Sequence, residues 1–127
     1  MKTICLDANI IVRFLQNDSK ELSPKAKRIL ESASKENRKL YIDEVVVAEV
    51  IWVLSSVYES PRDKIARQMR KLVNQNWVIN PRKKTILNTL QRFSNSSLSY
   101  IDCWLLEVCA KRGLKLETFD KALQKLT

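Results

Sequence analysis

The 127-residue sequence contains no histidine and only one glycine, Gly113. Without histidine the chain cannot form a Ser-His-Asp triad or a Cys-His pair, and it lacks histidine general bases and histidine metal ligands. One glycine is too few for a P-loop or a glycine-rich dinucleotide-binding turn, because both need several glycines at fixed spacing. Any enzymatic chemistry must therefore come from carboxylates, hydroxyls, lysine, arginine, cysteine or a bound metal.

Long uncharged segments are also missing. The longest uncharged run has ten residues, from Leu72 to Pro81, which is too short to span a bilayer. Near the amino terminus only four uncharged residues lie between Lys2 and Asp7, too few for the core of a signal peptide. We therefore expect a cytoplasmic protein that makes no contact with a membrane. The three cysteines all lie in apolar runs, which favours buried thiols in a reducing compartment over disulfides or a zinc site.

Negative charge is scarce as well. The chain has 23 Lys and Arg residues against 14 Asp and Glu residues, which gives a net charge of +9. A small basic domain of this kind favours a polyanionic partner such as RNA, which would bind through phosphate contacts. Lysine-rich surfaces also serve solubility, so charge alone leaves this second explanation open.

Short β-like runs alternate with helical patterns along the whole chain. Strands are expected at residues 2–6, 40–42, 77–79 and 114–119. Helices are expected to begin near Asn9, Ser23, Asp43, Ser60, Asn80 and Ser99, the last of them ending at Gly113. This order predicts a single α/β domain over residues 1–127, with a mostly parallel sheet of about four strands flanked by helices. In such folds functional sites form at the carboxyl ends of the strands.

Four carboxylates stand where apolar residues would be expected. They are Asp7, Glu49, Asp102 and Asp120. Placing an ionised carboxylate in an apolar setting costs on the order of several kcal/mol of free energy. Such a carboxylate is therefore usually paired with a cationic side chain, protonated or bound to a metal ion. Four of them converging in one fold would form a site for a hard divalent cation. The pattern therefore points to metal-dependent phosphodiester chemistry.

Three of these carboxylates also have a purely structural interpretation. Asp7 and Asp120 could each cap a following helix, and Asp102 could be the acidic member of a capping box that begins at Ser99. Glu49 has only valine and tryptophan three and four residues away, so no polar helix face is available to it. A functional or paired role is therefore favoured most strongly for Glu49.

Several polar residues could support such a site. Asn9 and Thr118 could hydrogen-bond a ligand or stabilise a turn, and Arg13 is the cation most suited to the base of the site. Two groups of basic residues could contact RNA, although each could equally be a solvated helix face. The first group is Lys64, Arg67 and Lys71, and the second is Arg82, Lys83 and Lys84.

The four acidic segments together resemble the PIN-domain nucleases, and among them the VapC-type toxins of toxin–antitoxin pairs. The resemblance lies in Asp7-Ala8-Asn9, in Glu49 with the apolar helix after it, in Tyr100-Ile101-Asp102 and in Thr118-Phe119-Asp120. It covers essentially the whole chain, with the motifs in order. One departure is that Lys121 and Ala122 stand where many relatives have a further acidic residue, which leaves four acidic candidates for one or two metal ions.

The resemblance implies a PIN-like three-layer fold and a Mg²⁺- or Mn²⁺-dependent endoribonuclease. Asp7, Glu49, Asp102 and Asp120 would then be both the metal ligands and the catalytic residues. It also implies an RNA substrate, a homodimer and a cognate antitoxin protein. A first alternative is a catalytically silent PIN-fold protein that binds RNA or another partner. A second is a phosphatase with Asp7 as nucleophile, which Asn9 disfavours because such enzymes carry a second aspartate there.

Overall fold

A computed structural model describes residues 3–36 and 38–127 of the chain, and this part contains three strands and seven helices. In chain order the elements are β1 (Ile4–Cys5), α1 (Ala8–Gln16), α2 (Leu22–Lys35), β2 (Leu40–Tyr41), α3 (Glu44–Ser56), α4 (Arg62–Val73), β3 (Val78–Ile79), α5 (Lys83–Ser94), α6 (Tyr100–Arg112) and α7 (Lys121–Gln124). The predicted alternation of strands and helices is confirmed.

The three strands form one parallel sheet in the order β1-β2-β3. Leu40 of the central strand aligns with Ile4 on one side and with Val78 on the other, and it is completely buried. A parallel sheet needs a crossover between successive strands, and here α1 with α2 and then α3 with α4 supply the two crossovers. The predicted α/β class with a parallel sheet is confirmed, with three strands in place of about four.

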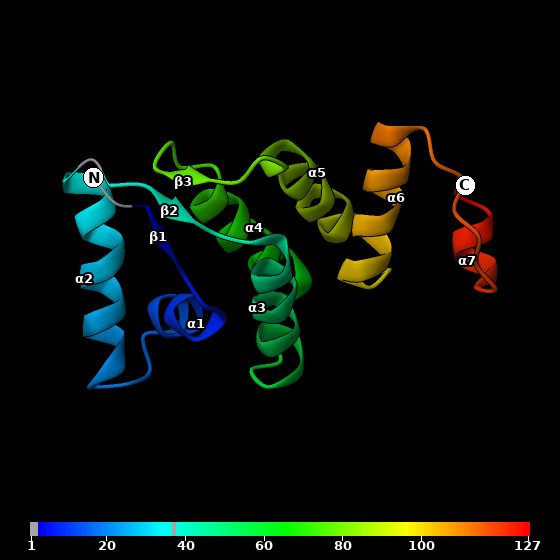
Figure 1. Cartoon of the computed structure of the whole chain (residues 1–127). Coiled ribbons are helices and arrows are strands. Elements are labelled where there is room, and N and C mark those ends of the chain that lie inside the picture. Colours follow the sequence, from blue (N-terminus) through cyan, green and yellow to red (C-terminus); the bar gives the residue numbers. More distant parts are fainter. Residues whose placement is uncertain (1–2, 37) are drawn as a thin grey trace.

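The helices divide into two groups around this small sheet. Figure 1 shows α1 and α2 near β1, and α3 and α4 beside the central part of the sheet. Helices α5 and α6 extend away from the sheet, and α6 and α7 form the end of the molecule farthest from β1. The core lies between the helices and the sheet and is mostly aliphatic. Among its fully buried side chains are Ile11, Leu40, Leu54, Met69, Ile86 and Leu90.

The expected fourth strand at residues 114–119 is wrong for this structure. The residues follow the C-cap of α6, Gly113, whose φ of 66° is a left-handed conformation that glycine adopts without strain. They then lead away from the sheet to α7 at the end of the molecule (Figure 1). Leu116 is half-buried while Leu114 and Phe119 stay exposed, and a cavity of about 200 Å³ between the segment and α6 is lined in part by Leu106, Cys109, Leu114, Leu116 and Leu126.

Local sequence signals located some helix ends well and others poorly. Asp43 caps α3 by accepting a hydrogen bond from the Val45 amide at 2.8 Å, and Ser99 caps α6 in the predicted way. The start predicted at Ser23 is wrong because α2 already begins at Leu22, and the Ser23 hydroxyl donates to the Arg13 carbonyl. Residues 60–63 (Ser-Pro-Arg-Asp) also have the pattern of a capping box, but Pro61 takes the N-cap position of α4 and no side chain caps the helix.

Tyr100 carries a buried hydroxyl that has no hydrogen-bond partner among the described residues. Its ring packs edge-on against Phe93 with 6.0 Å between ring centroids, and burial raises the pKa of its phenol above the ordinary value. An unsatisfied buried hydroxyl is unfavourable in the folded state. We therefore expect Tyr100→Phe to raise the free energy of unfolding by about 1 kcal/mol, measured by urea denaturation.

A matched variant tests this prediction in the opposite direction. The Tyr58 hydroxyl donates to Asp18 at 2.9 Å and accepts from Arg13, so Tyr58→Phe removes satisfied hydrogen bonds. We expect that change to lower the free energy of unfolding by about 1 kcal/mol. A loss of stability in Tyr100→Phe would contradict the assignment of an unsatisfied hydroxyl.

None of the described helices is both long enough and apolar enough to cross a membrane.

Candidate functional site

Asp7 and Asp120 both lie at the start of a helix and both act as caps. Asp7 follows β1, and its carboxylate accepts a hydrogen bond from the Ile10 amide at 3.1 Å. Asp120 precedes α7 and accepts from the Leu123 amide at 3.1 Å. The structural interpretation of both residues is therefore realised. Each carboxylate uses one oxygen for its cap, so the second oxygen stays available to a ligand.

Asp102 lies in the first turn of α6, where the helix dipole favours a negative charge. Its amide donates to the Ser99 hydroxyl at 3.1 Å, and its side chain is half-buried. Glu49 lies in the middle of α3 and is exposed, so the expectation of an apolar, closed environment is wrong. The reason is that its apolar helical neighbours are themselves exposed, Val45 by 72% and Trp52 by 64%.

The convergence of four carboxylates, expected from the sequence, is not seen within one chain. Residues 3–36 and 38–127 contain no group of three or more Asp, Glu, Cys or His side chains that could hold a metal ion. Asp120 lies with α6 and α7 at the end of the molecule opposite β1, which Asp7 follows (Figure 1). A single chain in this arrangement therefore does not fit a divalent metal site.

The four carboxylates nevertheless share one electrostatic property. In the described part of the chain none of them forms an ion pair, although the protein has a large excess of cations. The acidic residues that do pair with Lys or Arg are Asp18, Glu21, Glu31, Glu44, Glu107 and Glu117. Four further described acidic residues, Glu36, Asp43, Glu59 and Asp63, are unpaired as well, so the four candidates leave their charge open to a cation without being unique in this.

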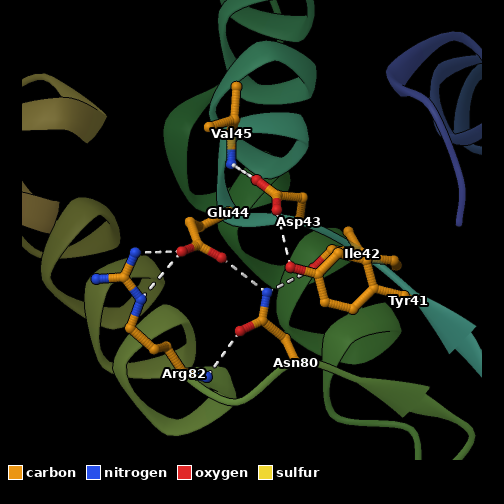
Figure 2. Close-up of polar contacts among 7 residues, drawn as sticks. All are labelled: Tyr41, Ile42, Asp43, Glu44, Val45, Asn80 and Arg82. Atoms are coloured by element: carbon orange, nitrogen blue, oxygen red, sulfur yellow. Dashed lines mark hydrogen bonds and ion pairs between the residues drawn. The ribbon is translucent and has the colours of Figure 1, made fainter.

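A polar cluster that sequence reasoning missed lies at the carboxyl ends of β2 and β3 (Figure 2). The side-chain nitrogen of Asn80 donates to the Ile42 carbonyl and to the Glu44 carboxylate, both at 2.9 Å. The side-chain oxygen of Asn80 accepts from the backbone amide of Arg82 at 2.7 Å. The Arg82 guanidinium binds the other oxygen of Glu44 through two nitrogens. The cluster therefore ties the start of α3 to the loop before α5. The available signal was the position of Asn80 directly after β3 and of Glu44 three residues after the end of β2.

The neighbours of this cluster extend it in two directions. The Tyr41 hydroxyl donates to the Asp43 carboxylate at 2.8 Å, on the side of the sheet. On the other side the Arg82 guanidinium lies 4.8 Å from the centre of the Trp104 ring in α6, a favourable cation–π geometry. The cluster thus connects β2, α3, α5 and α6. Glu49 belongs to α3 and Asp102 to α6, so the cluster joins the two helices that carry them.

The pKa of Glu44 gives a test of this cluster. Burial raises that pKa, but hydrogen bonds from Asn80 and Arg82 outweigh burial and lower it overall. A lowered folded-state pKa means that the stabilisation is present at neutral pH and is lost as the pH falls below the ordinary range of a carboxyl group. We expect Glu44→Gln to lower the free energy of unfolding by about 1–2 kcal/mol at pH 7. The difference from wild type should shrink in acid, and a difference that is equal at pH 7 and pH 3 would contradict the assignment.

The supporting residues expected from the sequence take different places. The Thr118 hydroxyl accepts from the Asp120 amide at 3.0 Å and so orders the turn before α7. Asn9 is exposed in the first turn of α1. Arg13 does not face the carboxylates, because its guanidinium pairs with Asp18 at 2.9 Å and donates to Tyr58. Its position is explained by these contacts between α1 and the segments after α1 and α3.

The second basic group, at the start of α5, is largely engaged within the protein. Arg82 binds Glu44, and the Lys83 ammonium donates to the Gln75 and Val78 carbonyls at 2.6 and 2.8 Å. Burial and the nearby Lys39 lower the pKa of Lys83. Lys84 is exposed. The group therefore offers one free side chain where the sequence indicated three.

The first basic group is open to solvent. Lys64, Arg67 and Lys71 on α4 are exposed and form no ion pair with any described carboxylate. Arg67 and Lys71 line a groove of about 460 Å³ between α4 and α5. Sequence analysis missed Arg70, which lies in the same groove and donates to Gln91 of α5. Among the described residues that line the groove, three are cations and one, Asp63, is a carboxylate.

A family model and one relative match nearly the whole chain. The profile of the PIN domain family matches residues 4–127, which include all four carboxylates. A protein named VapC ribonuclease from Aquifex aeolicus (strain VF5) is 22% identical over 122 residues, which are 95% of this chain and 90% of that protein. No solved structure matches the chain significantly.

Proposed function

The chain belongs to the PIN domain family, and we propose that it is a metal-dependent endoribonuclease that acts as the toxin of a toxin–antitoxin pair. The observation that carries this proposal is the match of the PIN domain family model to residues 4–127, within which four carboxylates occupy the segments that resemble the acidic motifs of the family. They are Asp7, Glu49, Asp102 and Asp120. None of the four is neutralised by a described Lys or Arg, and carboxylate oxygens are the ligands that hard divalent cations prefer.

The surrounding features are consistent with phosphodiester hydrolysis on RNA. A divalent cation held by carboxylates is a general means of activating water and neutralising a phosphate, and it requires no histidine. The three cations of the groove between α4 and α5 would attract the RNA backbone. The name of the Aquifex relative, a ribonuclease, supports RNA as the substrate class.

The proposal is tested by incubating the protein with end-labelled single-stranded and structured RNAs in Mg²⁺, in Mn²⁺ or in EDTA. We expect internal cleavage with either metal and none in EDTA, with activity restored when metal is added in excess of the chelator. Equal cleavage in EDTA would refute metal dependence. RNA binding without cleavage under any of these conditions would support a second function, a silent RNA-binding protein, which the lack of an assembled metal cluster in the described residues favours.

A cognate antitoxin and a homodimer belong to the same proposal. The antitoxin should bind the region of the carboxylates and inhibit cleavage, so that expression of the protein alone arrests growth and co-expression with its antitoxin relieves the arrest. Growth arrest that persists in the Asp7→Asn variant would separate toxicity from the proposed nuclease.

A further inference from the structure

Two extended segments of the molecule have backbone groups that are free to pair with a further strand. The amides of Ile4 and Leu6 donate to carbonyls on the β2 side at 3.0 and 3.1 Å, so the backbone of Cys5 between them faces the opposite edge. Within residues 3–36 and 38–127, β1 pairs with β2 alone and that edge stays open. The second part is the segment 114–119, whose amides from 115 to 119 donate to no described acceptor.

The segment 114–119 has the side-chain pattern of a strand. Leu114, Leu116 and Thr118 alternate with Lys115, Glu117 and Phe119. Phe119 is fully exposed, with a relative exposure of 102%, and Leu114 is 52% exposed. A β-like segment with a solvent-exposed phenylalanine and free amides is poorly satisfied where it lies. Pairing with an open parallel edge would satisfy its backbone.

The segment cannot reach β1 of its own chain while α6 stays packed. Cys103 of α6 is completely buried, and Glu107 of α6 pairs with Arg92 of α5 at 2.7 Å. Trp104 of α6 also lies under the Arg82 guanidinium. These contacts hold the end of α6 at the far side of the molecule from β1 (Figure 1). The same segment of a second copy has no such restriction, because it needs only to turn at Gly113.

We propose that two copies of this chain exchange residues 114–127, so that the segment 114–119 of each copy pairs in parallel with β1 of the other. Because Asp7 follows β1 and Asp120 follows the segment, parallel pairing brings the two aspartates to the same edge of the enlarged sheet. The exchange is reciprocal, so it closes as a two-fold dimer with two equivalent sites. Each of the two equivalent edges then holds Asp7 of one copy beside Asp120 of the other.

An exposed apolar stripe beside Glu49 fits this arrangement. Val45, Glu49 and Trp52 are spaced by four and three residues on α3, and both apolar members are largely exposed. Helix α3 packs against α1, which directly follows β1. A second copy docked at the β1 edge would cover apolar surface on this side, as a stable dimer requires.

A disulfide trap tests the exchange without any measurement of activity. The register that places Asp120 beside Asp7 also places Thr118 beside Cys5, which is exposed. We expect the Thr118→Cys variant to form a covalent dimer on mild oxidation, seen on a non-reducing gel and absent when Cys5→Ser is added as the matched control. An intrachain disulfide in a monomer would overturn the proposal, and so would the absence of any disulfide that depends on Cys5.

The molar mass of the wild-type protein gives a second test that requires no variant. Light scattering after size exclusion should give the mass of two chains, and a wild-type protein that stays monomeric at every accessible concentration would overturn the exchange. This measurement keeps the proposal testable if the Thr118→Cys variant fails to fold.

Complementation between inactive variants tests the shared site, and this part rests on the proposed nuclease function. Refolding Asp7→Asn together with Asp120→Asn should restore about one quarter of wild-type cleavage, because half of the dimers are mixed and each holds one intact site. The matched control is Asp7→Asn with Asp102→Asn, which should restore nothing because neither residue is exchanged. Complementation absent in both pairs overturns the exchange if the wild type cleaves RNA. If the wild type is inactive, the proposed function fails and the disulfide trap still decides the exchange.

Discussion

Asp7→Asn is expected to lower the rate of RNA cleavage by at least about 100-fold while the protein stays folded. The loss follows from the charge: interactions of a catalytic cation are worth several kcal/mol, and each 1.4 kcal/mol, roughly, is a factor of ten in rate. The fold should persist because Asn is as good an N-cap as Asp, so the hydrogen bond from the Ile10 amide can be kept. The measurements are single-turnover cleavage in Mn²⁺ and thermal unfolding of both proteins.

The control for this prediction is Asp43→Asn. Asp43 is the acidic N-cap after the neighbouring strand, two residues beyond the pair Cys5 and Tyr41 and so in register with Asp7, but both of its carboxylate oxygens are occupied within the protein, by the Val45 amide and the Tyr41 hydroxyl. We expect that variant to retain wild-type cleavage within a factor of about three, since it keeps a good capping side chain. If Asp7→Asn cleaves RNA as fast as wild type, Asp7 is a cap alone and the carboxylate site is refuted. Because the carboxylates are not clustered within one chain, no gain in stability from relieved repulsion is expected.

Charge reversal in the groove between α4 and α5 should produce the second large effect, on RNA affinity. The double variant Arg67→Glu and Lys71→Glu removes two cations that line the groove and form no described ion pair. We expect RNA affinity at low salt to fall by at least about tenfold, because two phosphate contacts are lost. Each lost contact should also reduce the slope of log K against log salt by about 0.7 for a single strand. Fluorescence anisotropy with labelled RNA in EDTA measures this binding without cleavage.

A control with the same change in net charge separates a local contact from a general electrostatic effect. Lys25→Glu and Lys27→Glu alter two exposed residues of α2 that pair with Glu21 and Glu31. This variant should change both the affinity and the salt slope much less than the groove variant does. If both double variants weaken binding equally, the groove acts only through the net charge of the protein and is not a phosphate track.

The fold class could be predicted because its signals are local. Alternation of short apolar runs with helical periodicity indicates an α/β fold with a parallel sheet. Asp43 and Ser99 indicate where α3 and α6 begin, because both are good N-cap residues. Capping needs only a polar side chain two or three residues from the amide that it accepts, so the sequence contains both partners. The predictions at Ser23 and Ser60 failed where a distant carbonyl or a proline changed the local balance.

The site itself depended on contacts that no local pattern contains. The sequence by itself determined which carboxylates interrupt apolar runs, how many charges the protein carries and in which order strands and helices follow. Only the tertiary structure decided that Glu49 is exposed, that Arg82 and Lys83 are engaged while the α4 cations are free, and that residues 114–119 leave the sheet. The physical reason is that burial, ion pairing and strand pairing each require a partner from a remote part of the chain or, as we propose for β1, from a second copy.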